Sequence, residues 1–255
     1  MGAIGATLAS LSMFGLLFVT PQYFRAVLGA DALGTGLRTL PMVAGLMVGM
    51  RGTMVLTRRL QARTLATAGF ALTAVGLAIG ATTGVDSGFL LCAVWTALVG
   101  LGFGASLFAS QNQALLTLPR PRAASGSALI QALRQCGSVL GIAVLGAVLN
   151  AAYRSDVAAL PVPDGSRQTV ADSPQAGVTV AAHVGDPALT HGIQAALVHG
   201  MDATLWVSAA LAVVGAFAMW RRMPRVATHT DLSPQHAGDA AESEHVPVTD
   251  SPVRA

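Results

Sequence analysis

Apolar residues in this chain are gathered into six long stretches separated by shorter polar links. Each stretch contains about 18 to 21 residues, and they cover Ile4–Tyr23, Leu37–Leu56, Leu65–Thr82, Phe89–Phe108, Leu129–Leu149 and Ala203–Trp220. An α-helix rises ~1.5 Å per residue, so a helix of this length crosses the ~30 Å hydrocarbon core of a bilayer. The pattern predicts an all-α membrane protein, a bundle of six transmembrane helices.

The acidic residues are excluded from these stretches. All twelve Asp and Glu residues lie outside them, and Asp202 stands at the edge of the last one. A charged side chain is costly at the centre of a bilayer, so this distribution supports a membrane location. It also means that no stretch contains the buried carboxyl group that a proton-coupled pump usually needs.

Composition supports the same class of protein. Hydrophobic residues make up 53% of the chain and charged residues only 11%, whereas soluble domains contain about 25% charged residues. All fifteen basic residues are arginines, and they lie in short clusters beside the apolar stretches. This placement argues against a nucleic-acid partner, although the net charge is +3.

The arginines also predict an orientation. One side of the predicted bundle carries Arg58, Arg59, Arg63, Arg120, Arg122, Arg221, Arg222 and Arg225, and the other carries Arg25, Arg38, Arg154 and Arg167. Positive charge collects on the cytoplasmic side of membrane proteins. We therefore expect both termini in the cytoplasm and the protein in the plasma membrane.

The links divide the chain into two parts. Residues 1–225 form the predicted membrane domain, in which Pro41 is expected in the first turn of the second helix. Its longest link, residues 154–201, is expected outside the cell, with a short interfacial helix at Ala188–His199. Residues 226–255 are polar and rich in proline, which predicts a disordered cytoplasmic tail.

Glycine pairs four residues apart recur in four of the stretches. They are Gly45 and Gly49, Gly76 and Gly80, Gly100 and Gly104, and Gly137 and Gly141. Such pairs allow two helix backbones to approach closely in a membrane. No motif of a hydrolase, nucleotide-binding protein or metalloenzyme is present, so a membrane enzyme is not expected, nor a cofactor or a metal site.

Two segments resemble the major facilitator superfamily, and more narrowly its fourteen-span drug:proton antiporters. The first runs from Gly15 through Thr20-Pro21-Gln22-Tyr23-Phe24 to Arg38-Thr39-Leu40-Pro41, and the second is Arg134-Gln135-Cys136-Gly137 with Gly141. Val198-His199-Gly200-Met201 is also similar. The resemblance implies one six-helix half of a major facilitator fold, the C-terminal half. It also implies that the complete transporter exports small hydrophobic or cationic compounds in exchange for protons, by alternating access.

The resemblance also implies roles for individual residues. Phe14, Phe18, Gln22 and Phe103 are predicted to contact the substrate, because aromatic faces suit apolar and cationic ligands. Arg59, Arg63, Arg134, Gly137 and Gly141 are predicted to act in gating or helix packing. The basic link departs from the family pattern, since Arg58 stands where the family has Asp and Gln61 where it has Gly.

One alternative function remains open at this point. The N-terminal half and its proton-coupling acids are missing from this sequence, so the partner would be that half or another one. The chain is then either a transporter fragment or a truncated or split half that transports nothing until it is paired.

Overall fold

The computed structural model describes residues 2–57, 59–85, 87–116 and 123–222. Within these residues, six helices are long and apolar enough to cross a membrane. They are α1 (Gly2–Ala26), α2 (Ala32–Leu56), α3 (Ala62–Gly80), α4 (Phe89–Leu116), α5 (Ala123–Val157) and α8 (Pro187–Arg222). The prediction of an all-α membrane protein with six spans is confirmed.

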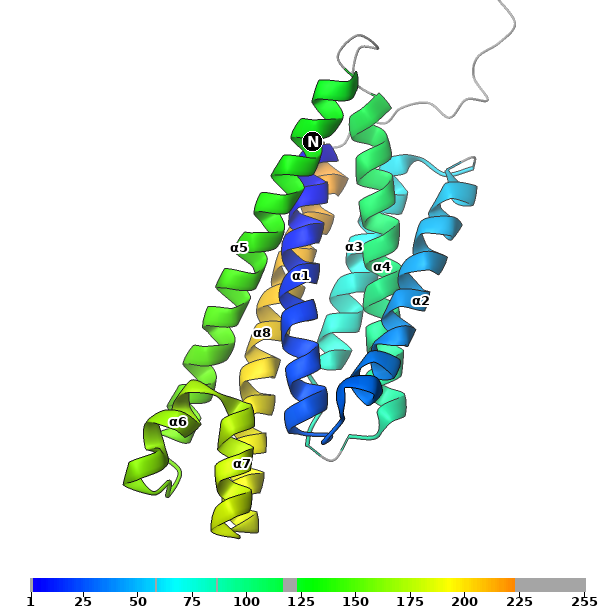
Figure 1. Cartoon of the computed structure of the whole chain (residues 1–255). Coiled ribbons are helices and arrows are strands. Elements are labelled where there is room, and N and C mark those ends of the chain that lie inside the picture. The colour runs from blue at the N-terminus through cyan, green and yellow to red at the C-terminus, as the bar shows by residue number, and fades with distance from the viewer. Residues whose placement is uncertain (1, 58, 86, 117–122, 223–255) are drawn as a thin grey trace, which may run out of the picture.

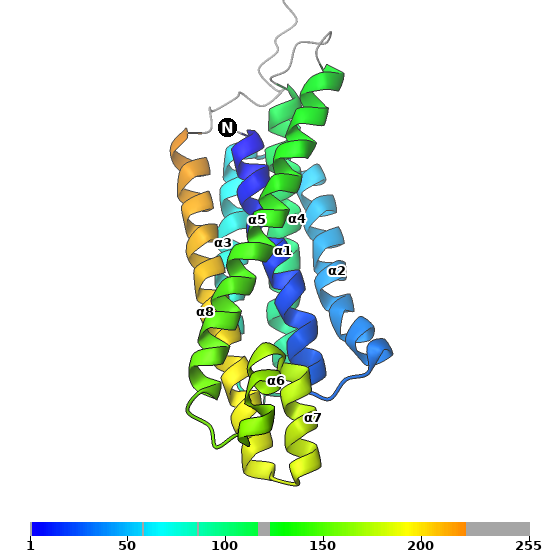
Figure 2. The ribbon, with the colours of Figure 1, turned by 60° about the vertical axis from the view of Figure 1, so that its left-hand side comes forward.

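The six helices run alternately up and down and form an elongated bundle (Figure 1). The start of α1 and the end of α8 lie at one end, which we call the terminal end: Gly5 is next to Ser110 of α4 and Met219 of α8. The other end, the α7 end, carries the short helices α6 (Arg167–Asp172) and α7 (Pro174–Val184), as Figure 2 also shows. The predicted tail at 226–255 lies outside the described residues.

Helix α4 packs against both α2 and α3, and glycines allow the close approach. Added Cβ atoms at Gly45 and Gly49 of α2 would overlap the backbone oxygens of Ala97 and Leu101. In the reverse direction, Cβ atoms at Gly100 and Gly104 would overlap the backbone oxygens of Met42 and Leu46. The two predicted pairs therefore meet in one crossing where neither helix has room for a side chain.

A second close crossing joins α1 and α5. A Cβ atom added to Gly137 would lie 2.7 Å from the Thr7 carbonyl oxygen, and one added to Gly141 would overlap the Leu11 carbonyl oxygen. Beyond this crossing α5 diverges from α1 and packs on α8, where Gly200 lies against the Leu149 backbone. Helix α1 is thus held between α5, α4 and α8.

Two helices at the α7 end begin earlier in the chain than the sequence predicted. Helix α8 begins at Pro187 and continues without a break, so the prediction of a separate helix at Ala188–His199 is wrong. Asp186 starts it by accepting hydrogen bonds from the Ala188 and Leu189 N–H groups, and Pro187 suits the first turn. Likewise α2 begins at Ala32, capped by Asp31, so Pro41 lies inside the helix and not in its first turn.

The segment predicted as a link, residues 154–201, is largely helical. The Tyr153 hydroxyl of α5 donates to the Val170 carbonyl of α6 at 2.8 Å, and Arg154 pairs with Asp172 at 2.6 Å. Buried apolar side chains then join α6 and α7 to the first turns of α8, among them Val170, Ala181 and Ile193. Gln194 of α8 donates to the Ala26 carbonyl at 3.1 Å, which fixes this small helical cap to the end of α1.

Candidate functional site

Three of the four predicted substrate contacts share one face of α1. Phe14, Phe18 and Gln22 follow each other at four-residue spacing, and they continue the stripe begun by Thr7 and Leu11. Thr7 and Leu11 face α5 at the glycine crossing, so the stripe runs on past that crossing toward the α7 end, where α5 has diverged. Phe14 and Gln22 are half-buried, and the Phe18 side chain lies outside the described residues.

The fourth predicted contact, Phe103, lies on the other side of α1. It occupies the face of α4 that also carries Cys92 and Ser110, eleven and seven residues away, or about three and two turns. Those two residues adjoin Tyr23 and Gly5 of α1, on the side of α1 opposite to Phe14. Phe103 is 7% exposed. The structure therefore brings Phe14 and Gln22 to one face and places Phe103 in the packed interior.

Two predicted gating arginines lie at the terminal end. Arg59 is exposed in the turn between α2 and α3. Arg63, in the first turn of α3, places its guanidinium 4.7 Å from the centroid of the Trp220 ring of α8, a cation–π contact. This contact links the start of α3 to the end of α8 and gives Arg63 a packing partner at this end.

The remaining predicted gating residues lie on α5. Arg134 is half-buried and lies three residues before Gly137, so it shares the α1-facing side of the helix with Gly137 and Gly141. Its backbone carbonyl accepts a hydrogen bond from Ser138 at 3.0 Å. The structure thus brings the three residues to the α1–α5 crossing, with Arg134 on its terminal side.

Charge is unevenly distributed between the two ends. The terminal half of the bundle carries Arg51, Arg59, Arg63, Arg134 and Arg221, and none of the described acidic side chains. The α7 end carries Asp31, Asp156, Asp172, Asp186 and Asp202 together with Arg25, Arg38, Arg154 and Arg167. Among the described side chains, the terminal half therefore carries only positive charge, whereas the α7 end carries charges of both signs.

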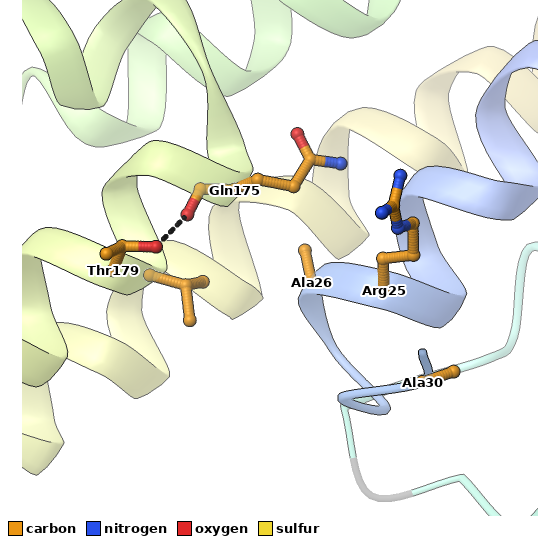
Figure 3. Close-up of a pocket in the computed structure, with 6 residues that line it drawn as sticks. Arg25, Ala26, Ala30, Gln175 and Thr179 are labelled. Carbon is orange, nitrogen blue, oxygen red and sulfur yellow. Dashed lines mark hydrogen bonds between the residues drawn. The ribbon is translucent and has the colours of Figure 1, made fainter. Parts of the chain in front are cut away.

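A cavity of about 550 Å³ lies between the end of α1 and α7 (Figure 3). Arg25, Ala26 and Ala30 line one side, and Gln175, Val178 and Thr179 of α7 line the other. The Thr179 hydroxyl donates to the Gln175 carbonyl at 3.0 Å, inside α7. The volume is in the range of small-molecule pockets, but Phe14, Gln22 and Phe103 do not line this cavity. The sequence did not indicate it, because α7 fell within a predicted link.

Comparisons with known proteins give relatives of one kind. No protein-family model matches the chain. The chain is 28% identical over 225 residues to the multidrug efflux pump LfrA of Mycolicibacterium smegmatis, covering 82% of this chain and 43% of the pump. It is 29% identical over 187 residues to the tetracenomycin C resistance and export protein of Streptomyces glaucescens, covering 73% of this chain and 34% of that protein.

The name of a third relative states its class of transporter. The chain is 37% identical over 97 residues to an uncharacterized MFS-type transporter of Mycobacterium tuberculosis, covering 38% of this chain and 14% of the transporter. The chain thus spans less than half the length of each of these curated relatives. These relatives are MFS-type and multidrug efflux transporters. The described part of this chain contains six helices that are long and apolar enough to cross a membrane, as a transporter requires.

Proposed function

We propose that this chain is the C-terminal six-helix half of a multidrug efflux transporter of the fourteen-span antiporter type. With its other half it exports small hydrophobic or cationic compounds in exchange for protons. The observation that carries the proposal is the similarity to a multidrug efflux pump over 82% of the chain. The resemblance of the Arg134–Gly141 segment to the drug:proton antiporters supports the subfamily.

The mechanism follows from the architecture of one bundle. In alternating access, two helix bundles rock around a site near the midplane of the membrane. The close glycine crossings of α2 with α4 and of α1 with α5 make this bundle suitable to move as one body. Its partner is a second bundle, which supplies the opposite wall of the substrate path.

The face of α1 that carries Phe14, Phe18 and Gln22 is our candidate substrate face. Phe14 and Gln22 are half-buried, and they lie beyond the α1–α5 crossing at Thr7 and Leu11. An aromatic ring beside an amide provides an apolar surface, an attractive face for a cation and one hydrogen-bonding group. Phe103 supports this face from the interior, because it packs on the opposite side of α1.

We expect Phe14→Ala to weaken export of a lipophilic cation by about fivefold in apparent affinity, the equivalent of about 1 kcal/mol for one lost cation–π contact. The measurement is concentration-dependent export by a protein in which this chain replaces the matching segment of the M. smegmatis relative. Phe89→Ala is the matched control, since Phe89 is exposed at the start of α4. Equal export by the two variants would show that Phe14 does not contribute to substrate binding.

We further propose that the terminal end is cytoplasmic and that the protein lies in the plasma membrane. The arginine-rich terminal half supports this orientation. In a variant without Cys92 and Cys136, we expect Ser166→Cys to react with a membrane-impermeant maleimide in intact cells. Ser243→Cys should react only after permeabilisation. The opposite pattern of labelling would contradict the proposal, because it would place the terminal end outside the cell.

A further inference from the structure

Polar side chains from several segments gather at the α7 end of the bundle. The Tyr23 hydroxyl of α1 donates to the Gly84 carbonyl at 3.1 Å, and the Cys92 sulfur of α4 lies 4.0 Å from that hydroxyl. Cys92 in turn lies within electrostatic reach of Arg38 and beside the Trp95 indole, and Tyr23 lies within reach of Asp202. Thr83 directly precedes Gly84 in the chain. We call this group the α7-end polar cluster; its members are Tyr23, Arg38, Thr83, Cys92, Trp95 and Asp202.

Four buried polar atoms of this cluster have no hydrogen-bond partner among the described residues. They are Arg38 Nη1, Thr83 Oγ1, Trp95 Nε1 and Asp202 Oδ1. Trp95 and Thr83 are 0% and 1% exposed, and the Cys92 sulfur beside the indole is a weak acceptor. Buried polar atoms in native proteins are nearly always satisfied, so a concentration of exceptions indicates a site for a small polar species.

Asp202 is the one carboxyl group of the cluster, and its surroundings differ from those of Asp156 nearby. Asp156 of α5 accepts a hydrogen bond from His199 Nδ1 at 2.6 Å, which compensates its charge. Asp202 has one oxygen removed from solvent and no donor to it. An ionised carboxyl group without donors is costly away from water, and uptake of a proton removes that cost.

His199 provides a connection between Asp202 and the solution. It precedes Asp202 by three residues on α8, so the two side chains lie on the same side of the helix, within electrostatic reach. The His199 side chain is 66% exposed. A solvent-facing imidazole has nitrogen atoms that can accept and release a proton, so His199 can pass one between the solution and a neighbouring carboxyl group.

We propose that Asp202 is a proton-binding site, loaded through His199 from the solution at the α7 end. A proton from solution is transferred to the Asp202 carboxylate and leaves a neutral carboxylic acid. This inference rests on the proposed function for its role in transport, where Asp202 would bind a proton at the face from which an exporter takes one up. The binding of the proton itself does not depend on that function.

Two titratable groups lie within electrostatic reach of Asp202, Tyr23 of α1 and His199 of α8 itself. Further groups adjoin these two: Cys92 of α4 lies beside Tyr23 and within reach of Arg38 of α2, and Asp156 of α5 is hydrogen-bonded to His199. The one ionisable side chain of α3, Arg63, lies at the terminal end. The His183 ring of α7 is engaged with the Thr179 carbonyl at 2.8 Å.

The direct test is an infrared titration of the purified whole chain in lipid nanodiscs. We expect a protonated-carboxyl band that persists to higher pH than the bands of exposed carboxyl groups, disappears in Asp202→Asn and remains in Asp156→Asn. His199→Ala should keep the band and slow its response to a pH jump. Identical titrations of the wild type and Asp202→Asn would overturn the proposal.

A second measurement requires no variant. A hydrophobic carbodiimide reacts with protonated carboxyl groups in apolar surroundings, and mass spectrometry of the wild-type chain locates the modified residue. We expect modification at Asp202 that declines as pH rises, and none at Asp156. A chain that is unmodified at Asp202 at every pH would overturn the assignment. Because neither measurement involves transport, failure here is distinguishable from failure of the proposed function.

Discussion

Replacing Gly49 by leucine will prevent this chain from forming a stable bundle. A Cβ atom at this position already overlaps the Leu101 carbonyl oxygen of α4, and the rest of a leucine side chain would force α2 and α4 apart. Overpacking of a close contact costs about 1–3 kcal/mol, and separating the helices also removes the contacts at Gly45, Gly100 and Gly104. The measurement is the yield of monodisperse protein in detergent and its thermal unfolding temperature.

Gly52→Leu is the matched control, three residues further along the same helix. No atom lies within 4 Å of a Cβ built at Gly52, and leucine favours a helix over glycine by less than about 1 kcal/mol. This variant should therefore unfold at the wild-type temperature or slightly above it. Equal behaviour of the two leucine variants would show that the α2–α4 crossing does not limit stability.

The second large effect is that the isolated chain does not transport. Reconstituted alone into proteoliposomes, the 255-residue chain should not move a lipophilic cation in response to an imposed pH gradient. One six-helix bundle provides one wall of a path that two rocking bundles normally enclose. Arg51 and Arg134 cannot carry the proton, because a guanidinium group stays protonated at any working pH.

Protein-dependent transport under these conditions would contradict that expectation. It would indicate that two copies of the chain assemble into a complete path. The control is protein-free vesicles of the same lipid composition under the same pH gradient. Cross-linking of the wild-type chain in the proteoliposomes would show whether two copies are in contact.

The number and nature of the long helices could be predicted from the sequence, whereas their starts could not. Hydropathy reports the part of a helix that lies in lipid, and α2 and α8 extend beyond it. Asp31 and Asp186 each cap a helix several residues before the apolar stretch begins. The turns that follow Asp186 are held by contacts with α7, which in turn packs on α6, and no local pattern in the sequence records those contacts.

The candidate site was predictable where it depends on one helix and unpredictable where it depends on several. The four-residue spacing of Phe14, Phe18 and Gln22 places them on one face of any helix. The position of Phe103 on the far side of α1 depends on how α4 packs, which its spacing alone does not reveal. The α7-end polar cluster was missed for the same reason, because each member is an ordinary residue in its own segment.

The central claim is that this chain forms one working half of an efflux transporter, and joining it to a second half tests that claim most directly. The joined protein has this chain in place of the matching segment of the M. smegmatis multidrug efflux pump, and the intact pump serves as the positive control. In proteoliposomes with an imposed pH gradient, we predict movement of a fluorescent lipophilic cation that stops when a protonophore removes the gradient. A folded joined protein that transports no more than empty vesicles, beside an active intact pump, would contradict the account.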